Sequence, residues 1–139
     1  MGCEDLFHFY ADVAYFGQSD FCSFEANARA SMWQGNSVTL WLHLFVNGVP
    51  VDDLAAALSG TFQAMGHRDN VAGNTQVYPG TLSINDPEIG VVKVFLGSAV
   101  TDLMEGEYDL AIEFTWADKK YVWRFGKTLY VMRDQILFP

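Results

Sequence analysis

The sequence has few basic residues and no long uncharged apolar run, and each scarcity argues against a class of protein. Eight Lys and Arg residues stand against 17 Asp and Glu residues, which gives a formal net charge of −9. Nucleic acids and anionic membrane surfaces are bound by clustered basic side chains, so we expect neither as a partner. The longest uncharged apolar run, Val38 to Val51, is interrupted by Asn47-Gly48 and is too short to span a bilayer.

Cysteine is equally scarce, with Cys3 and Cys22 as the two examples. They form no CxxC pair, and no histidine lies at zinc-ligand spacing from either, so they predict no metal site. A disulfide between them stays open, with reduced thiols as the expectation for a protein assembled in a cytoplasm. Glu4 and Asp5 occupy the place where a secretory signal carries Lys or Arg, so we expect no such signal.

Residues in catalytic arrangements are also missing from the sequence. His8, His43 and His67 are far apart, and no GxSxG-like context surrounds any serine. His43 stands between two leucines in an apolar run, which favours a satisfied sheet residue over a ligand. The sequence therefore predicts no catalytic residues and no cofactor.

Carboxylates do occur in pairs, but the pairs fall within predicted turns. Acidic residues are common in turns, so solvated turn residues are the favoured interpretation. A glycosidase would need two carboxylates facing each other across a cleft, which spacing does not establish. A calcium site at Asn85, Asp86 and Glu88 is a less favoured alternative, and we expect no metal. The pairs are Asp52-Asp53, Asp86 with Glu88, and Glu105 with Glu107.

The clearest positive feature is a long hairpin from Glu105 to Val131. Apolar and polar residues alternate with a period of two on both sides of the polar segment Ala117 to Lys120. This pattern predicts two half-buried strands joined by a short loop. A bulge is expected near Gly126, followed by a last strand from Leu129 to Leu137. The predicted core includes Leu40, Leu42, Leu110, Ile112, Phe114 and Trp123.

Further strand patterns precede the hairpin at short, fairly even spacing, and together they predict an all-β sandwich. Val38 to Val46 is apolar on both faces, so it is expected to be central or covered by another element. Asn47-Gly48 predicts a tight turn, and Asp52 or Asp53 is expected to cap one helical turn through Ala55 to Ala57. The other expected elements are strands at Phe24–Met32, Gly60–Met65, Gln76–Tyr78, Thr81–Ile84 and Val91–Leu96, and a crossing segment at Ser98–Met104.

The segment from Asp5 to Phe16 is ambiguous and rich in aromatic residues. Its apolar spacing predicts a short amphipathic helix. Two interpretations stay open for its aromatic side chains. They pack on their own domain, or they form an arm that docks onto a neighbouring subunit, as terminal segments are free to do.

The four tryptophans also admit two interpretations. Aromatic residues at strand spacing are usually core or subunit interface, which is the favoured interpretation. The alternative is a carbohydrate-binding β-sandwich module in which exposed residues around Trp116 stack on sugars. The tryptophans are Trp33, Trp41, Trp116 and Trp123.

Gly106-Glu107-Tyr108, just before a predicted strand, matches a structural device of immunoglobulin-like sandwiches. In such sandwiches a tyrosine at the start of a late strand hydrogen-bonds backwards and pins a corner. Leu110 stands where antibody domains have the second cysteine. The sequence therefore predicts an immunoglobulin-like topology without the disulfide.

Five segments between about Ser31 and Gln135 resemble, in their order, a family of tailed-bacteriophage proteins. They are Gln34–Leu40, Asn47–Leu54, Asn85–Val94, Glu105–Leu110 and Gly126–Val131. Together they resemble the immunoglobulin-like N-terminal domain of phage baseplate upper proteins and related small tail or neck proteins. The doubled Asp52-Asp53 and the aromatic N-terminal segment depart from that family's pattern.

The resemblance implies an antiparallel immunoglobulin-like β-sandwich over residues 31–139, preceded by an N-terminal arm and first strand over residues 1–30. It implies a non-enzymatic structural protein of the virion, in baseplate, tail or neck, assembled in the host cytoplasm. Its expected partners are other virion structural proteins and copies of itself. The residues expected to bind partners are Phe7, Phe9, Tyr10, Tyr15 and Phe16 of the arm, and His67, Arg68 and Asp69 of the loop Gly66–Gly73.

Overall fold

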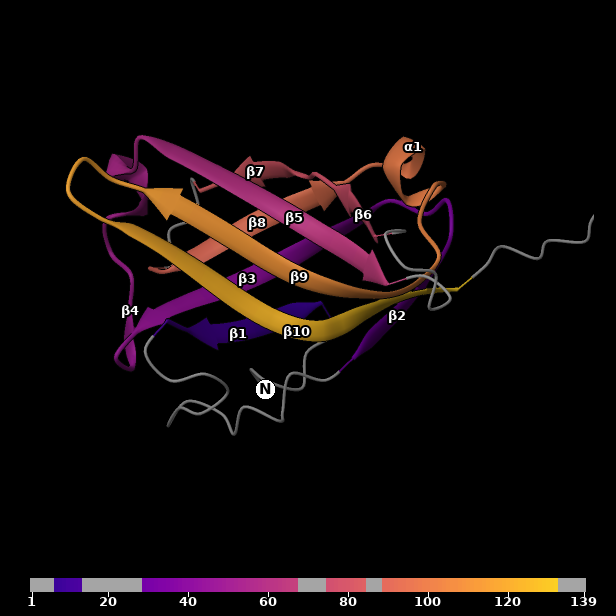
Figure 1. The fold of residues 1–139 in the computed structure, drawn as a ribbon, viewed down its shortest axis with the longest axis horizontal. Coiled ribbons are helices and arrows are strands. Elements are labelled where there is room, and N and C mark those ends of the chain that lie inside the picture. The colour runs from indigo at the N-terminus through magenta and orange to yellow at the C-terminus, as the bar shows by residue number, and fades with distance from the viewer. Residues whose placement is uncertain (1–6, 14–28, 68–74, 85–88, 133–139) are drawn as a thin grey trace, which may run out of the picture.

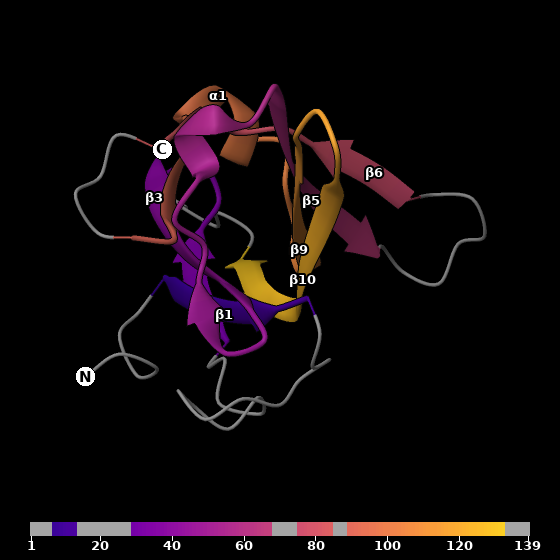
Figure 2. The same cartoon turned by 90° about the vertical axis from the view of Figure 1, so that its left-hand side faces the viewer.

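Two β-sheets face each other, and the end-on view separates them into two layers (Figure 1; Figure 2). The computed structural model describes residues 7–13, 29–67, 75–84 and 89–132. Within these residues, single turns of 3-10 helix at Leu54–Ala56 and of α-helix in α1 (Ser98–Thr101) interrupt the strands. The predicted all-β sandwich is confirmed.

The first sheet is built around β3 (Val38–Val46) and is called the β3 sheet. β1 (His8–Asp12) pairs in parallel with one edge of β3, and β8 (Val91–Leu96) pairs antiparallel with the other edge. β7 (Thr81–Ser83) extends the sheet beyond β8, while the short β4 (Val49–Pro50) pairs with the end of β3. β3 is therefore the central strand, as its two apolar faces predict.

The second sheet is built around the hairpin of β9 (Gly106–Thr115) and β10 (Lys120–Met132) and is called the β9 sheet. β5 (Ser59–His67) pairs antiparallel with β9, and β6 (Thr75–Tyr78) pairs antiparallel with β5. β2 (Ala30–Trp33) pairs in parallel with β10 at the opposite edge. The long hairpin predicted from the alternating sequence is confirmed.

Glycine is required at two points of this topology. Gly126 has a φ of +82° and lies where the register between β9 and β10 shifts, so the predicted bulge is confirmed. Gly80 lies between β6 and β7, where the chain passes from the β9 sheet to the β3 sheet. A Cβ atom on Gly80 would lie 2.4 Å from a methyl carbon of Val94, so the crossing has no room for a side chain.

The core lies between the sheets and is filled by alternate residues of the strands. On β9 the even-numbered residues from Tyr108 to Phe114 are buried, while the odd-numbered residues between them are half-buried. On β2 the same alternation buries Ala30 and Met32 and exposes Ser31 and Trp33. The six predicted core residues are all buried: Leu40, Leu42, Leu110, Ile112, Phe114 and Trp123.

Two buried indoles make hydrogen bonds to backbone carbonyl oxygens as well as packing contacts. Trp123 of β10 donates its Nε1–H to the carbonyl oxygen of Phe45 on β3, at 2.9 Å. Trp116 donates its Nε1–H to the carbonyl oxygen of Asp53, at 3.0 Å. Each indole thus buries its apolar surface and still satisfies its polar group, as buried tryptophans usually do. The favoured interpretation of these two tryptophans as core residues is confirmed.

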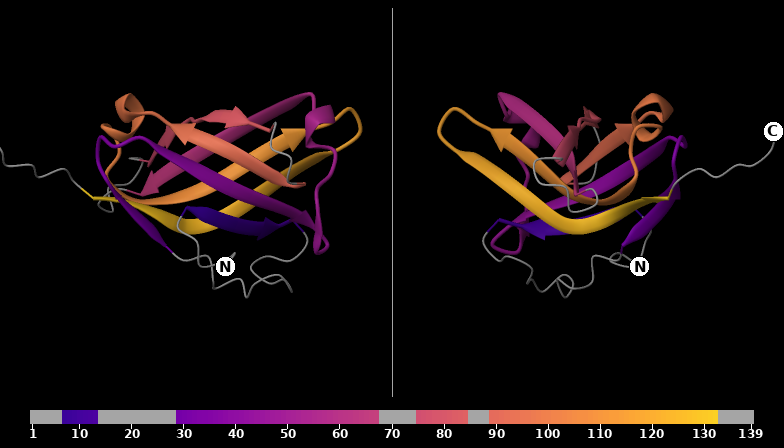
Figure 3. Two further views of the ribbon diagram at one scale, coloured as in Figure 1. Left: turned by 180° about the vertical axis from the view of Figure 1, so that it is seen from behind. Right: turned by 45° about the vertical axis from the view of Figure 1, so that its right-hand side comes forward.

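The N-terminal segment differs from the prediction. A helix between Asp5 and Phe16 is wrong for residues 8–12, because they form β1 along the edge of β3 (Figure 3). The side chains of Phe9 and Ala11 point into the core, and Phe9 is fully buried. Without β1, the backbone N–H and C=O groups along that edge of β3 would lack hydrogen-bond partners in the sheet. Pairing with β1 supplies these partners, whereas a helix over residues 8–12 would not.

The predicted division of the chain at residue 30 does not coincide with a structural boundary. β1 is a strand of the β3 sheet, so residues 8–12 belong to the sandwich. β2 begins at Ala30 and spans the predicted division. Residues 1–6 and 14–28, which include Cys3 and Cys22, lie outside the described residues, as does the candidate calcium site at 85–88.

The turn between β3 and β4 forms as predicted. Asn47 and Gly48 both have positive φ, +55° and +80°, as a two-residue hairpin turn of this kind requires. The expected helical turn follows at Leu54–Ala56, and of the two predicted capping residues, Asp52 and Asp53, it is Asp53 that lies at the N-cap position, although its side chain makes no capping hydrogen bond. The Asp53 carboxylate instead accepts a hydrogen bond from Lys119 at the tip of the β9–β10 hairpin, at 3.2 Å.

The tyrosine corner also forms. The hydroxyl of Tyr108 accepts a hydrogen bond from the backbone N–H of Glu105 at 2.7 Å, just before β9 begins. Nearby, the hydroxyl of Thr101 in α1 donates to the carbonyl oxygen of Asn36 at 2.8 Å. The bond from Thr101 to Asn36 fixes the crossing from β8 to β9 against the turn between β2 and β3. The predicted hydrogen bond between Tyr108 and the chain just before it is confirmed, with the Tyr108 hydroxyl as the acceptor.

Candidate functional site

The outer face of the β3 sheet is unusually aromatic. One row of side chains crosses it where His8, Trp41 and Lys93 are register partners on β1, β3 and β8. The rings of His8 and Trp41 stack with centroids 5.2 Å apart and an angle of 8° between their planes. The ammonium nitrogen of Lys93 lies 4.5 Å from the centroid of the Trp41 ring, a cation–π contact. The Trp41 ring is therefore engaged by a neighbour from each adjoining strand.

A second row lies beside the first and is joined to it by a histidine pair. Tyr10 and His43 are register partners, and their rings stack with centroids 4.2 Å apart. Nδ1 of His8 lies 3.0 Å from Nε2 of His43, so one imidazole donates and the other accepts a hydrogen bond. This pair agrees with the prediction that His43 is a satisfied residue of the sheet. We call His8, Tyr10, Trp41, His43, Lys93 and Phe95 the aromatic face.

Phe95 extends the aromatic face beyond these rows and is its most exposed member. It lies on β8 opposite Thr39 of β3, and 49% of its surface is exposed. Its neighbours in sequence, Val94 and Leu96, are fully buried, so Phe95 points outward from the sheet. An aromatic side chain held in this way presents apolar surface for contact at little cost in conformational entropy.

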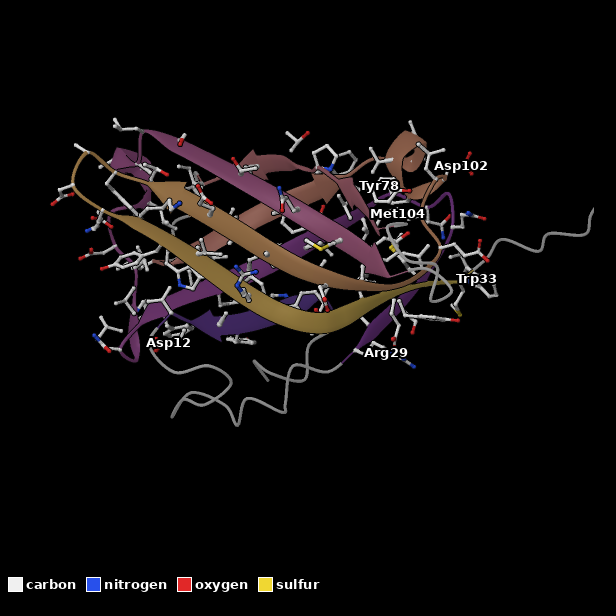
Figure 4. The ribbon with its side chains drawn as sticks, viewed as in Figure 1. Asp12, Arg29, Trp33, Tyr78, Asp102 and Met104 are labelled. Carbon is white, nitrogen blue, oxygen red and sulfur yellow. The ribbon has the colours of Figure 1, made fainter. Side chains whose placement is uncertain are left out.

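The described strands of this sheet carry few carboxylates. Of the described residues on β1, β3, β4, β7 and β8, one is acidic, Asp12 at the end of β1. Its carboxylate accepts hydrogen bonds from the backbone N–H groups of Asn47 and Gly48, at 3.0 and 2.6 Å. Figure 4 shows Asp12 beside the turn that follows β3. The charge of Asp12 is thus engaged by the turn, where it ties β1 to the β3–β4 hairpin.

The outer face of the β9 sheet has a different chemistry. Glu107, Asp109 and Glu113 lie at the outward positions of β9, and Arg124 is exposed on β10. A guanidinium nitrogen of Arg29 lies 2.9 Å from a carboxylate oxygen of Glu107, at the edge where Figure 4 shows Arg29 beside β2. Mixed charges of this kind are typical of a solvated sheet face.

The tip of the β9–β10 hairpin is a third cluster, and its contacts are structural. Lys119 donates a hydrogen bond to Asp53, and its ammonium nitrogen lies over the rings of Trp116 and Tyr121, at 4.9 and 5.8 Å from their centroids. The hydrogen bond to Asp53 is the main cause that raises the pKa of Lys119 above its usual value of 10.5. These contacts fasten the hairpin tip to the segment that leads into β5.

The residues predicted to bind partners are not all at the surface, and four of them lie outside the described residues. Tyr10 lies on the aromatic face, Phe7 is half-buried and packs against the core, and Phe9 is buried within the core. The prediction that Phe9 contacts a partner is therefore wrong, because its side chain is fully buried. His67 is the last residue of β5. Tyr15, Phe16, Arg68 and Asp69 lie outside the described residues.

Sequence reasoning missed most of the aromatic face. The one indication in the sequence was that the Val38–Val46 strand is apolar on both faces. We interpreted this pattern as a strand that is central or covered by another element. The stacking partners of Trp41 and His43, which are His8 and Tyr10, come from β1, which the sequence predicts as a helix, so the cross-strand ring stacks could not be foreseen. The alternative hypothesis of a carbohydrate-binding module requires Trp116 to be exposed. It is wrong at this residue, because Trp116 is only 6% exposed.

Within the described parts of the chain, no three His, Cys, Asp or Glu side chains are grouped so that they could hold a metal ion. No helix among the described residues is both long and apolar enough to cross a membrane.

No family model matches the chain, and neither does any curated protein. Among solved structures, the chain is similar to the N-terminal domain of ORF48 of phage TP901-1. The similarity covers 92% of this chain and 98% of that domain, with 11% sequence identity and a TM-score of 0.46. A similarity of this size is a weak likeness of fold and carries no argument about function.

Proposed function

We propose that this chain is a non-enzymatic structural protein of a tailed-phage virion, a component of the baseplate, tail or neck. The observation that carries the proposal is the aromatic face, a partly exposed set of aromatic side chains on a sheet whose described strands carry one carboxylate, Asp12. Aromatic residues are enriched and charged residues depleted in the cores of protein–protein interfaces. A building block that acts by assembling with neighbours needs such a face.

The motifs that resemble the phage family support the same proposal through the structural roles of their residues. Asn47 and Gly48 form the turn into β4, and Tyr108 ties the corner before β9. Gly90, with a φ of +78°, precedes β8, and a Cβ atom there would lie 2.9 Å from the carbonyl oxygen of Leu44. The residues that carry the resemblance therefore have defined structural roles in this fold.

The strand order supports an immunoglobulin-like assignment of the sandwich. The order β3-β8-β7 in one sheet corresponds to strands B-E-D, and β10-β9-β5-β6 in the other corresponds to strands G-F-C-C′. The tyrosine corner then lies at the start of strand F, where immunoglobulin-like domains have it. β1 departs from this plan, because it pairs in parallel with β3.

The proposed partners are other virion structural proteins and copies of this chain, with the virion as location after assembly in the host cytoplasm. Quantitative mass spectrometry of purified virus particles tests this proposal, with an abundant host protein of similar size as the control for contamination. We expect a fixed small-integer ratio between this chain and known particle proteins. Recovery no greater than that of the host protein would overturn the proposal.

A further inference from the structure

We propose that Asn47 is a site of spontaneous deamidation, and that the carboxylate of Asp12 keeps this reaction slow while β1 is paired with β3. The side-chain amide of Asn47 is the reacting group, the backbone nitrogen of Gly48 is the nucleophile, and water is the co-reactant. The reaction is independent of the proposed function, because it involves only the turn between β3 and β4 and the end of β1.

The reaction needs no groups beyond those of the turn and water. Asparagine is among the thermolabile residues, because the backbone nitrogen of the next residue can attack its side-chain amide. Here the nitrogen of Gly48 attacks Cγ of Asn47 and forms a cyclic imide, while the bond from Cγ to Nδ2 breaks. The amide proton of Gly48 leaves with Nδ2, which departs as ammonia. Water then opens the imide at either carbonyl and leaves aspartate or isoaspartate at position 47, and no electrons are transferred.

The sequence and the exposure of the turn favour the reaction at Asn47. Gly48 has no side chain, so no Cβ atom crowds the attacking nitrogen. Asn47 and Gly48 are both exposed, so water reaches the imide once it has formed. Asn36 is the other asparagine among the described residues, and it is followed by Ser37, whose Cβ atom crowds the corresponding nitrogen. Asn47 is therefore the more reactive of the two once its turn opens.

Asp12 binds the same nitrogen that must attack. Its Oδ2 accepts a hydrogen bond from the N–H of Gly48 at 2.6 Å, and its Oδ1 accepts one from the N–H of Asn47 at 3.0 Å. Hydrogen bonds from an amide to a carboxylate are short and strong. The nitrogen becomes a nucleophile only as it gives up its proton, and a carboxylate at this distance opposes the negative charge that develops there. The bond from Gly48 to Asp12 therefore suppresses the first step.

The turn also holds the backbone in place. Asn47 and Gly48 have φ values of +55° and +80°, which are typical of a two-residue hairpin turn. Closing the imide requires rotation about the bond from Cα to C of Asn47, and this rotation moves the nitrogen of Gly48 away from Asp12. β4 pairs with β3 over two residues, so the Asp12 bonds provide much of what keeps the turn closed. Asn47 therefore reacts from an open turn, whose population is set by Asp12.

The product of the reaction weakens the attachment of β1. Deamidation places a second carboxylate in the turn that Asp12 binds, and like charges within one turn repel each other. Isoaspartate also adds a carbon atom to the main chain of the turn. Asp12 is the last residue of β1, and β1 carries Phe9, whose side chain is fully buried in the core. Deamidation is thus a one-way change that loosens the edge strand of the β3 sheet.

Timed incubation of the full chain at neutral pH, followed by peptide mapping with mass spectrometry, tests the protection by Asp12. Asp12→Ala removes the acceptor of both hydrogen bonds, and Glu107→Ala removes an exposed carboxylate of the β9 sheet as the matched control. We expect Asp12→Ala to speed the deamidation of Asn47 about 10-fold, because two hydrogen bonds to a charged group are together worth at least one tenfold step. Glu107→Ala should leave this rate unchanged.

Two internal controls separate release of the turn from general unfolding. The rate at Asn36 should be the same in the wild type and in both variants, because its turn does not involve Asp12. Asp12→Asn keeps one oxygen acceptor without the charge, so its rate at Asn47 should lie between those of the wild type and Asp12→Ala.

Asn47→Asp tests the consequence for β1, since it carries the charge of the product. We expect hydrogen exchange in β1 to be faster in Asn47→Asp than in the wild type, while exchange in β9 stays the same. Asn47→Gly is the matched control, because glycine accepts a positive φ and adds no charge. It should leave exchange in β1 close to that of the wild type.

An unchanged rate at Asn47 in Asp12→Ala would overturn the protection, and a slower rate would mean that Asp12 acts as a base. A rate that rises equally at Asn36 and Asn47 would also overturn it, because the cause would then be general unfolding. If Asn47 reacts no faster than Asn36 in Asp12→Ala, Asn47 is not the reactive site. Equal exchange of β1 in Asn47→Asp and Asn47→Gly would show that the product leaves the edge strand in place.

Discussion

The outer faces of the two sheets differ although the sheets share one core. On the β9 sheet the outward positions carry mixed charges, such as Glu113 on β9 and Arg124 on β10. On the β3 sheet the outward positions carry rings, such as Trp41 and His43, stacked on residues of β1. Both sheets contribute buried residues to the one core, so the difference between the outer faces does not arise from the demands of the core.

This difference separates what folding requires from what assembly requires. A sheet with one buried face needs alternation of apolar and polar residues, and β9 has this pattern. β3 goes further and keeps aromatic residues on its second face, where water would favour polar groups. Surplus aromatic surface of this kind usually marks an interaction site. Four experiments would break or sharpen the comparison, beginning with the one that has the largest expected effect.

Phe114→Ala tests the shared core on which the comparison rests. Phe114 is buried on β9, and its ring covers the backbone of Gly60 on the adjacent strand. Removing the ring should lower the free energy of unfolding by about 3–5 kcal/mol, because it leaves a cavity between the sheets. Chemical denaturation measures this loss. Glu113→Ala, on the outward side of the same strand, should cost less than about 0.5 kcal/mol. A loss under about 1 kcal/mol at Phe114 would mean that the two faces of β9 are reversed.

Asp12→Ala tests whether the aromatic face depends on the attachment of β1. The substitution removes the acceptor for two backbone N–H groups in the β3–β4 turn. We expect a loss of about 1–3 kcal/mol, because partly buried amides would lose their partner. Hydrogen exchange should accelerate in β1 more than in β9. Asp12→Asn keeps one oxygen acceptor and should lose less stability. Equal exchange in β1 before and after Asp12→Ala would show that the ring stacks alone hold the strand.

Much of the β9 sheet could be predicted from the sequence, because its stabilising pattern is local. The period-two alternation of β9, the bulge at Gly126 and the backward bond of Tyr108 all follow from residues close together in the chain. Each has a distinct local cause: strand pleating, a positive φ that glycine accepts readily, and a short reach from hydroxyl to backbone. The inner face of β3 was predictable for the same reason.

The aromatic face could not be predicted, because its contacts join segments that are far apart in the sequence. His8 and His43 are 35 residues apart, and their meeting depends on β1 adding to β3 in parallel. The segment His8 to Asp12 has five residues, and over so short a length helix and strand periodicities can bury the same side chains. The strand is favoured because it can pair with the edge of β3. That edge is formed by residues far away in the sequence.

His43→Ala compares an aromatic contact on one face with an ion pair on the other. The substitution removes the stack on Tyr10 and the hydrogen bond to His8. We expect a loss of about 0.5–1.5 kcal/mol, the range for aromatic pairs. Glu107→Ala removes the exposed ion pair with Arg29, and this should cost about 0–1 kcal/mol. Added salt should shrink the effect of Glu107→Ala and leave that of His43→Ala unchanged. A salt-sensitive effect at His43 would mean that charge, and not ring packing, holds the aromatic rows together.

The smallest effect compares two lysines that lie over aromatic rings, Lys93 on the β3 sheet and Lys119 at the tip of the β9–β10 hairpin. Lys93→Met keeps the apolar stem and should cost about 0.5–1 kcal/mol through the lost cation–π contact.

Lys119→Met should lower the free energy of unfolding in a pH-dependent way, because the hydrogen bond to Asp53 raises the pKa of Lys119 in the folded protein. A raised pKa means that the folded state binds the proton more tightly than the unfolded state does. The contribution of Lys119 is therefore present below its usual pKa of 10.5 and is lost as the pH rises through the raised value. Denaturation of both proteins at neutral and at strongly alkaline pH should show the difference between wild type and Lys119→Met vanish at the alkaline end. A difference that persists there would mean that Lys119 acts by packing on Trp116 and Tyr121 and not by its charge.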